Sequence, residues 1–466
     1  MIDTYALKEK VIELAIQGKL TNQLPSDGDA ADLLSQIQTE KDRKQDRINK
    51  RKANFVVEED VPFEIPKNWK WAHLGEVCQL SDGEKKETKH LPVLSVLFLR
   101  GKASATYSDN GRFASRESNL ILVDGENSGE VFSSLIDGYI GSTFKLLQIS
   151  PVVNEEYIIR FIDFNRKLLK KSKTGSAIPH LNKELFFSLF LPLPPLSEQK
   201  RIVEKINQIF VEINVIDSLQ QQYEVNREAL KGKIIDAGIR GKLTEQLTED
   251  GNADDLYAQI QEEKAKIIES RGGRKDKSIK AEDEDKPFII PDSWKWIRLG
   301  EVGLFKKGPF GSALTKSMFV PKSDDAVKVY EQQHAIKKNA RLGMYYISRE
   351  YYESAMTGFE VKSGDIIVSC AGTIGESYIM PSEIEQGIIN QALMRVTLVP
   401  SIVDKFFLFY FDSNLKSNAQ NESNGMAIKN IPPFDVMKNW YFPLPPLEEQ
   451  KRIVSIIESL LNQLAT

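Results

Sequence analysis

Basic and amide side chains gather in four stretches of the chain, two in each half. These stretches read SDGEKKETKH (81–90), LRGKASATYSDNGRFASRES (99–118), FKKGPFGSALTKSMFVPK (305–322) and VYEQQHAIKKNARLG (329–343). Lysine and arginine suit phosphates and guanine edges, glutamine and asparagine suit adenine edges, and glycine permits close backbone approach. These residue types predict contacts with nucleic acid. The candidate contact residues are Lys85, Lys86, Lys89, His90, Arg100, Lys102, Arg112, Arg116, Lys306, Lys307, Gly308, Ser312, Lys316, Gln332, Gln333, His334, Lys337 and Lys338.

A search for catalytic groups finds only fragments of motifs. The segment IPPF (431–434) has the Pro-Pro-aromatic part of the loop of adenine methyltransferases, but Ile431 stands where an amide or carboxylate is needed. The segment PDSWKW (291–296) begins like a nuclease signature, yet its counterpart PKNWKW (66–71) lacks the aspartate. The four histidines show no metal-ligand spacing, and no G-x-x-x-x-G-K-[ST] phosphate loop occurs. We therefore expect neither catalysis nor a bound metal or cofactor in this chain.

Composition bounds the class of protein. The chain has 466 residues, of which 41% are hydrophobic and 27% charged, which indicates a folded protein of roughly two to four domains. Its two cysteines, Cys78 and Cys370, exclude a disulfide framework. Because no apolar run reaches about 18 residues and the N-terminus lacks a signal-peptide pattern, we expect a cytoplasmic protein without a membrane span. The net charge of −4 does not itself indicate nucleic-acid binding, although acidic helices can mask a basic face.

The chain contains the same plan twice. PLPPLSEQKRIV (192–203) returns as PLPPLEEQKRIV (443–454) with one difference, and ALKEKVIELAIQGKLT (6–21) returns as ALKGKIIDAGIRGKLT (229–244). The tryptophan segments PFEIPKNWKW (62–71) and PFIIPDSWKW (287–296) also match. Only the interior of each copy, between its tryptophan segment and its PLPPL junction, differs. This pattern predicts a tandem duplication with two divergent domains.

Each PLPPL junction is expected to end a sheet domain and start a long helix. Prolines suit a helix start and not a central strand, and Ser197 is a candidate N-cap. The apolar stripe of the helices falls at coiled-coil spacing, at Ile202, Ile206, Ile209 and Ile213 and again at Ile453, Ile457 and Leu460. These residues are expected to form the helical spacer and its partner contacts.

The expected fold is α/β, with two α/β domains joined by two coiled-coil-like helical connectors in a pseudo-two-fold tandem repeat. Strands are predicted at 91–99, 118–123, 364–370 and 392–399. The expected divisions are an N-terminal helical repeat (1–55), domain one (56–195), a central helical spacer (196–280), domain two (281–446) and a C-terminal helix (447–466). Pairing of the terminal helices would complete the second connector, whereas two independent domains in series are the alternative. The charge-dense segments 41–52 and 271–286 are expected to be solvated linkers, with direct DNA contact as the alternative.

The repeated junctions, the IPKNWKW and IPDSWKW segments and the glycine-containing GKLT helices resemble the specificity subunits of type I restriction-modification enzymes. The resemblance covers nearly the whole chain. It implies two target recognition domains that each read half of a split double-stranded DNA sequence. It also implies docking of two methylation subunits, which carry S-adenosylmethionine, and of two motor/nuclease subunits, which carry ATP and Mg. KKGPFGSAL (306–314) matches a family loop near DNA, whereas its first-domain counterpart SDGEKKET (81–88) departs from that pattern.

Helix geometry agrees with this expectation. A helix from about 198 to 226 would be roughly 40 Å long at about 1.5 Å per residue, close to the 34–36 Å or so of one turn of B-DNA. Two alternatives to a specificity subunit are also compatible with these residues. One is a self-contained DNA methyltransferase or nuclease, and the other is a protein scaffold that reads no sequence.

Overall fold

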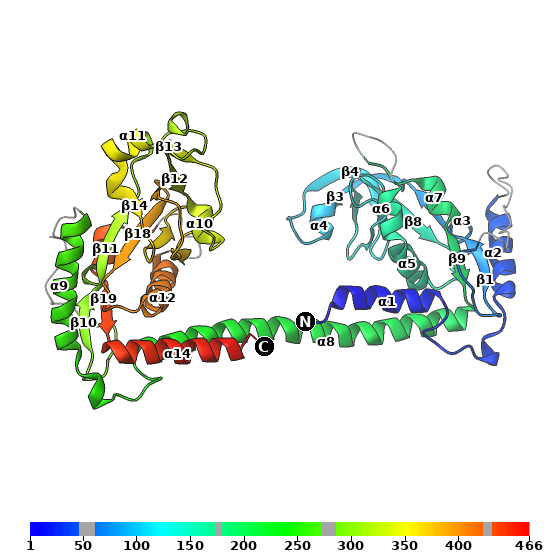
Figure 1. Cartoon of the computed structure of the whole chain (residues 1–466). Coiled ribbons are helices and arrows are strands. Elements are labelled where there is room, and N and C mark those ends of the chain that lie inside the picture. Colours follow the sequence, from blue (N-terminus) through cyan, green and yellow to red (C-terminus); the bar gives the residue numbers. More distant parts are fainter. Residues whose placement is uncertain (46–60, 173–178, 272–285, 423–430, 466) are drawn as a thin grey trace. The chain divides into compact units, whose positions relative to one another are not determined.

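The computed structural model describes residues 1–45, 61–172, 179–271, 286–422 and 431–465. The chain forms two compact units, Met1–Gln222 and Tyr223–Thr466. Each unit combines helices with small mixed sheets, as the ribbon in Figure 1 shows. The two α/β units confirm the predicted fold class.

Unit 1 places an α/β domain between helices. Its helices are α1 (Thr4–Ile16), α2 (Ala30–Gln45), α3 (Leu74–Val77), α4 (Val96–Leu99), α5 (Glu155–Phe164), α6 (Arg166–Lys171), α7 (Lys183–Ser188) and the start of α8 (Leu196–Ile239). Its strands are β1 (Lys70–His73), β2 (Cys78–Ser81), β3 (Lys85–Leu94), β4 (Tyr107–Ala114), β5 (Asn119–Leu122), β6 (Val131–Ser133), β7 (Gly138–Ile140), β8 (Phe144–Ile149) and β9 (Phe190–Leu193).

Unit 2 repeats this order with a different interior. Its helices are the end of α8, α9 (Ala253–Arg271), α10 (Gln332–Ile336), α11 (Arg349–Tyr351), α12 (Asp404–Glu422), α13 (Phe434–Lys438) and α14 (Leu447–Gln463). Its strands are β10 (Lys295–Arg298), β11 (Gly303–Lys307), β12 (Ala326–Tyr330), β13 (Tyr346–Ser348), β14 (Glu360–Val361), β15 (Ile366–Ser369), β16 (Ser377–Ile379), β17 (Gly387–Ile389), β18 (Leu393–Leu398) and β19 (Tyr441–Leu444).

The two units share the strand order of one four-stranded sheet and of one two-stranded pair, whereas the remaining strands form a three-stranded closed barrel (β3-β4-β7) in unit 1 and a four-stranded sheet (β13-β12-β17-β14) in unit 2. The order β2-β8-β5-β6 in unit 1 corresponds to β11-β18-β15-β16 in unit 2. In each unit a second group of strands contains one parallel pair, β3 with β7 and β12 with β17. A two-stranded antiparallel pair, β1 with β9 and β10 with β19, joins the tryptophan segment to the strand of the PLPPL junction. The interiors therefore differ in sequence and in their second strand group, while they keep the four-stranded sheet and the two-stranded junction pair.

In each unit one helix packs its apolar face into the core beneath the four-stranded sheet that the units share. In unit 1 the apolar side of α5, with Tyr157, Ile158 and Phe161, packs into the same core as β5 and α8. In unit 2 the aromatic side of α12, with Phe406 and Phe407, takes this role. Burial of such large side chains contributes roughly 1.5–3 kcal/mol each. A rigid core therefore supports the loops that differ between the units.

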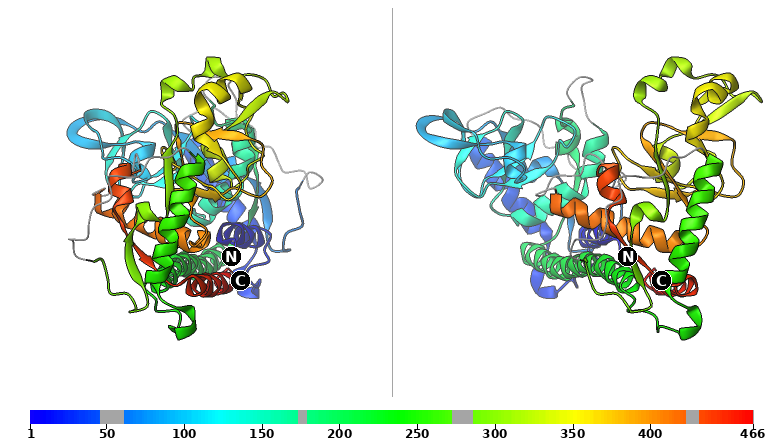
Figure 2. Two further views of the ribbon diagram at one scale, coloured as in Figure 1. Left: turned by 60° about the vertical axis from the view of Figure 1, so that its left-hand side comes forward. Right: turned by 90° about the vertical axis from the view of Figure 1, so that its left-hand side faces the viewer.

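The repeated GKLT helix and the repeated junction helix lie side by side within each unit (Figures 1 and 2). In unit 1, α1 runs antiparallel to the first part of α8, because Lys8 bonds Asn214 while Thr4 bonds Asp217 farther along. In unit 2 the last part of α8 lies against α14, and a Cβ at Gly238 would lie 2.7 Å from an Ile457 methyl. Glycine is therefore needed at position 238 for this close helix approach.

Two expectations are corrected, and the one that keeps proline out of a central strand is confirmed. The predicted strand at 91–99 ends at Leu94, and Val96–Leu99 forms α4, because Ser95 caps Phe98 and starts a helical turn. Ser197 is not an N-cap, since α8 already begins at Leu196, and its hydroxyl instead bonds Asp27. Pro192 lies inside β9, which pairs only with β1, so that its missing N–H is tolerated on the open edge. The charge-dense segments 41–52 and 271–286 lie largely outside the described residues.

Candidate nucleic-acid interface and its supporting junction

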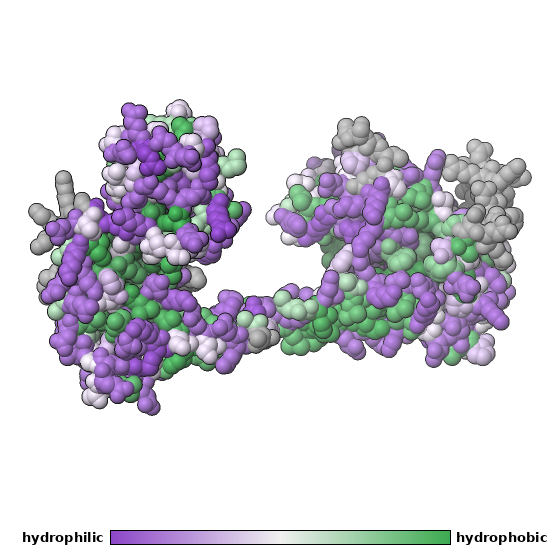
Figure 3. Space-filling model, in the orientation of Figure 1, coloured by the Kyte–Doolittle hydropathy of each residue, from purple (hydrophilic) through white to green (hydrophobic). Residues whose placement is uncertain are grey.

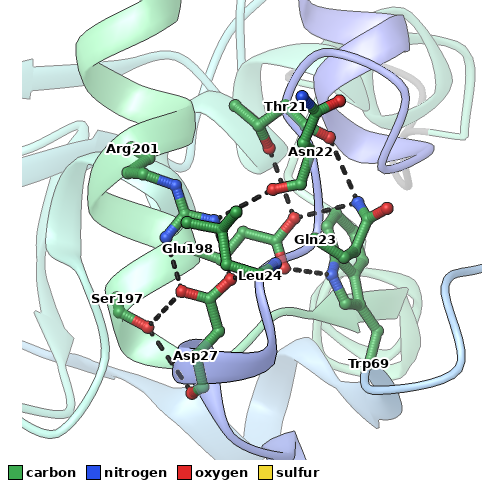
Figure 4. Close-up of polar contacts among 9 residues, drawn as sticks. All are labelled: Thr21, Asn22, Gln23, Leu24, Asp27, Trp69, Ser197, Glu198 and Arg201. Carbon is green, nitrogen blue, oxygen red and sulfur yellow. Dashed lines mark hydrogen bonds and ion pairs between the residues drawn. The ribbon is translucent and has the colours of Figure 1, made fainter.

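The repeated junction forms a buried hydrogen-bond cluster in unit 1. The carboxylate of Glu198, in the first turn of α8, is fully buried. It accepts hydrogen bonds from Trp69 Nε1 at 2.8 Å, Gln23 Nε2 at 3.0 Å and Thr21 Oγ1 at 3.3 Å. Figure 4 shows these donors converging on Glu198 from the tryptophan segment and from the turn after α1. One carboxylate thus ties three parts of the unit together.

An ion pair between Arg201 and Asp27 lies beside this cluster. Arg201, one helical turn after Glu198, donates to both carboxylate oxygens of Asp27 and to the Asn22 carbonyl oxygen. Ser197 also donates to Asp27 at 3.0 Å. The hydrogen bonds from Arg201 above all lower the pKa of Asp27 to about 2. Asp27 is therefore ionised over the whole physiological range and fixes the start of α8.

Unit 2 builds the same cluster from the second copy of each motif. Buried Glu449 accepts from Trp294 Nε1 at 2.8 Å, Thr244 Oγ1 at 2.8 Å and Gln246 Nε2 at 2.6 Å. Arg452 donates to both oxygens of Asp250, and this hydrogen-bonded ion pair lowers the pKa of Asp250. We call these two groups the junction clusters of units 1 and 2.

The glutamine of the motif joins each helix start to its domain. Gln199 accepts from the Asn154 N–H at 2.7 Å and donates to the Pro194 carbonyl oxygen at 2.8 Å. Gln450 accepts from the Val403 N–H at 2.9 Å and donates to the Pro445 carbonyl oxygen at 3.1 Å. The shared Glu-Gln-x-Arg spacing was visible in the sequence. Its partners were not identified there, because they lie far away along the chain.

The divergent loops of unit 2 are bonded to one another. The Gly308 N–H donates to the Leu393 carbonyl oxygen at 2.9 Å, and the Cys370 N–H donates to the Ala392 carbonyl oxygen at 2.9 Å. The Gln332 side chain donates to the Ala371 carbonyl oxygen. The loops near residues 308, 332, 371 and 392 therefore form one surface, which we call the loop surface of unit 2.

Most candidate residues of the loop surface are solvent-exposed. Exposed side chains are those of Lys306, Lys307, Ser312, Lys316, Lys337 and Lys338. Lys306 lies 4.7 Å above the Phe359 ring, and Lys338 bonds Glu376 at 2.9 Å. Gln332 and Gln333 are half-buried, and Gln333 bonds Glu331 at 2.9 Å. The loop surface thus presents lysines suited to phosphate contacts.

The prediction that His334 contacts nucleic acid is corrected by its burial. Its ring is fully buried, Nε2 lies 2.6 Å from the Leu342 carbonyl oxygen, and Nδ1 accepts from the Glu331 N–H at 2.8 Å. Both ring nitrogens are therefore used to fold the loop, and neither is free to meet a base. The sequence could not distinguish this role from a surface one, because the residue type is the same in both.

The candidate residues of unit 1 are divided between an exposed hairpin and internal ion pairs. Lys85, Lys86 and His90 are exposed on β3, and Lys102 and Arg116 are exposed nearby. Arg112 instead bonds Asp82 at 2.7 Å, and Arg100 bonds Glu130. The charges of these two arginines are thus partly neutralised inside the unit. The side chain of Lys89 lies outside the described residues.

The helical stripe faces each unit's own core, which corrects the expectation of partner contacts from these residues. Ile202, Ile206 and Ile213 are buried against α1 and α5, with Ile209 half-buried beside them. Ile453 and Ile457 are buried in unit 2, and Leu460 is half-buried. Side chains enclosed in this way leave no surface for another subunit.

The described residues contain no group of three or more His, Cys, Asp or Glu side chains placed to hold a metal ion. Burial raises the pKa of the Cys370 thiol to about 12, which keeps it protonated. None of the helices in the described ranges is long and apolar enough to cross a membrane.

Two units that share one four-stranded sheet order and one junction cluster around different loops, with α8 running from one unit into the other, define a modular two-domain protein. The family model for the type I restriction modification DNA specificity domain matches residues 66–225 and 291–466. The chain therefore belongs to the type I restriction-modification specificity family and is a specificity subunit.

Similar proteins agree with this membership. The chain is 25% identical to the type I restriction enzyme EcoAI specificity subunit of Escherichia coli, with 99% of this chain and 90% of that protein covered. It is 24% identical to the MjaVIII specificity subunit of Methanocaldococcus jannaschii, with 85% and 87% covered. A chain from a solved structure concerned with complex assembly and conformational transition of the type I R-M system superimposes with a TM-score of 0.60 at 16% identity. That alignment covers 87% of this chain and 93% of the other, and supports the fold.

Proposed function

We propose that this chain is the sequence-reading, non-catalytic subunit of a type I restriction-modification complex and that it binds an asymmetric bipartite DNA target. The observation that carries the proposal is that the two units share one four-stranded sheet order and one junction cluster but carry unrelated loops. A constant framework with variable loops suits two domains that bind their partner subunits in the same way and read different bases.

The proposed partners are double-stranded DNA, two methylation subunits and two motor/nuclease subunits. S-adenosylmethionine, ATP and Mg would be bound by those subunits and not by this chain. An exposed apolar row on α8 in unit 1, with Val211, Val215 and Leu219 at four-residue spacing, supports docking of a methylation subunit. Figure 3 shows apolar surface along the helical part of this unit.

Mapping of methylated adenines in a host that expresses this chain with its methylation partner tests the proposal. The expected result is one split motif with two different halves. Exchange of the unit 2 loops for those of another specificity subunit is expected to change one half and leave the other intact. Methylation without sequence preference would favour a scaffold that reads no sequence. Methylation by the purified chain alone would favour a self-contained enzyme.

Helix length is proposed to set the spacer between the two half-sites. A heptad inserted between residues 221 and 226 of α8 would leave the contact of Gln220 with Ile2, just before α1, and the contact of Gly238 with α14 unchanged. Seven residues add about 10 Å of helix at about 1.5 Å each, or about three base pairs at roughly 3.4 Å per step. We expect the methylated motif to gain about three spacer positions with both halves unchanged. An unchanged spacer would contradict this role of the helix.

A further inference from the structure

Phe310 stands out on the loop surface of unit 2 because its ring is almost fully in water. Its side chain is 88% exposed, whereas Phe164, the next most exposed described phenylalanine, reaches 38%. An exposed phenylalanine forgoes the stabilisation that burial of its ring would give. Isolated exposed apolar residues are common and need no explanation by themselves. The exposure of Phe310 gains meaning from the way its loop is held.

This loop is anchored on both sides of Phe310. Before it, a Cβ at Gly308 would lie 1.9 Å from the Asn390 carbonyl oxygen, so the backbone approaches its neighbour as closely as glycine allows, and Pro309 is buried. After it, Leu314 is buried in the core, and the Ala313 carbonyl oxygen accepts from the Tyr351 hydroxyl at 2.6 Å. The tip is thus fixed at both ends, with the ring in solvent.

The surroundings of the ring suit DNA better than a protein partner. Its chain neighbour Gly311 is exposed and has open space beside it, and exposed Ser312 follows. Exposed lysines stand at 306, 307 and 316, and the sequence has no acidic residue from 302 to 323. Protein interfaces need a broad complementary surface. A single ring flanked by cations instead matches a base step between two phosphate backbones.

We infer that Phe310 is a wedge that enters a base step of the half-site read by unit 2, stacks on a base and kinks the duplex there. Apolar side chains used in this way part the stack while neighbouring basic groups hold the phosphates. Pyrimidine–purine steps open most easily, so the half-site of unit 2 is expected to contain one. The unit 1 counterpart, SDGEKKET (81–88), has no aromatic residue. We therefore expect an aromatic wedge to enter a base step only in the half-site read by unit 2. This inference rests on the proposed function of the chain as a DNA-reading subunit.

The test uses the complex with the methylation partner and duplexes that carry its mapped target. 2-Aminopurine is placed at each position of the half-site in turn, and its fluorescence reports unstacking. Because a methyltransferase flips its target base out of the stack, the target adenine is left out of the scan, and we expect emission to rise at one further step with the unmodified complex and with Phe310→Trp. Phe310→Ala should lose this signal and bind roughly 5- to 100-fold more weakly. The matched control is Ile289→Ala, which removes another highly exposed apolar side chain of unit 2 at a place before β10.

Several outcomes would overturn the inference. One is sequence-specific binding with no unstacked position in the half-site other than the target adenine. A second is Phe310→Ala binding within about twofold of the unmodified complex. A third is failure of Phe310→Ala to co-purify with the methylation subunit, which would assign the ring to a protein contact. A complex that binds all sequences alike would overturn the proposed function itself, and this inference with it.

Discussion

The junction cluster of unit 2 can be tested by removing its central carboxylate. Glu449→Gln keeps the volume of the side chain but replaces a charged acceptor by an amide. Glu449→Ala removes the acceptor altogether. Glu448→Ala is a matched control, because this neighbouring glutamate has a side chain 60% exposed and pairs only with Lys451, one turn away, among the described ion pairs.

The size of the effect follows from the three donors. A hydrogen bond to a charged group contributes about 1.5–3 kcal/mol, and a buried donor left without a partner costs about 1–3 kcal/mol. Gln246 is exposed and can turn to water, whereas the Trp294 N–H is buried. The loss is therefore dominated by Trp294, and we expect Glu449→Ala to destabilise unit 2 by about 2–4 kcal/mol. For a unit of this size that lowers the midpoint of its thermal unfolding by roughly 4–16 °C.

Calorimetry and tryptophan fluorescence measure this prediction together, because Trp294 is itself a donor in the cluster. The transition of unit 2 should move down, while that of unit 1 stays unchanged. Glu198→Ala should produce the reverse pattern. Desolvation can make a buried charge costly, so the reasoning is refuted if Glu449→Ala unfolds within about 0.5 kcal/mol of Glu448→Ala.

Two further predictions concern acid stability and salt. The pKa of Asp27 is about 2 in the folded chain against a usual 3.8. Its ion pair with Arg201 should thus contribute about 2 kcal/mol above pH 3.8, lost as the pH falls through about 2. Between pH 5 and pH 2, the urea midpoint of unfolding should fall less steeply with pH for Asp27→Asn than for the unmodified chain. An equal fall in both proteins would contradict the stabilising role of the Asp27–Arg201 ion pair. Combined replacement of Lys306 and Lys307 by alanine should make the plot of the logarithm of the DNA-binding constant against the logarithm of salt concentration less steep by about 1.8. Lys451→Ala should leave it unchanged, and equal slopes for all three proteins would show that neither lysine meets a phosphate.

The exposed and the internally paired loop residues could not be told apart from the sequence, and the reason is physical. Lys307 and Arg100 look alike as basic loop residues. In the fold one is exposed, while the other pairs with Glu130, which lies beyond the next two strands. By residue type His334 resembles its polar neighbours and is predicted to be a surface contact residue. It is buried instead, because Gly343 lets the chain fold back over it. Local composition cannot report which polar groups satisfy one another inside the fold.

The helical stripe shows a similar division. Spacing alone identified Ile202, Ile206 and Ile213 as one face of a helix, and that face exists. It did not reveal that α1 and α5 already cover the face, because periodicity specifies a buried side without naming what buries it. The pairing of the terminal helices remains a prediction.

By itself the sequence determined the duplication, the α/β character of both interiors and the start of a long helix at each PLPPL junction. These follow from repeats, from β-rich apolar runs and from proline, all of which act locally. The tertiary structure alone decided what the repeated Glu-Gln-x-Arg residues do. Glu198 meets Trp69 and Thr21, and Arg201 meets Asp27, only after the domain between them has folded. A buried carboxylate is stable only with such partners, and partners from distant parts of the chain are chosen by packing and not by spacing.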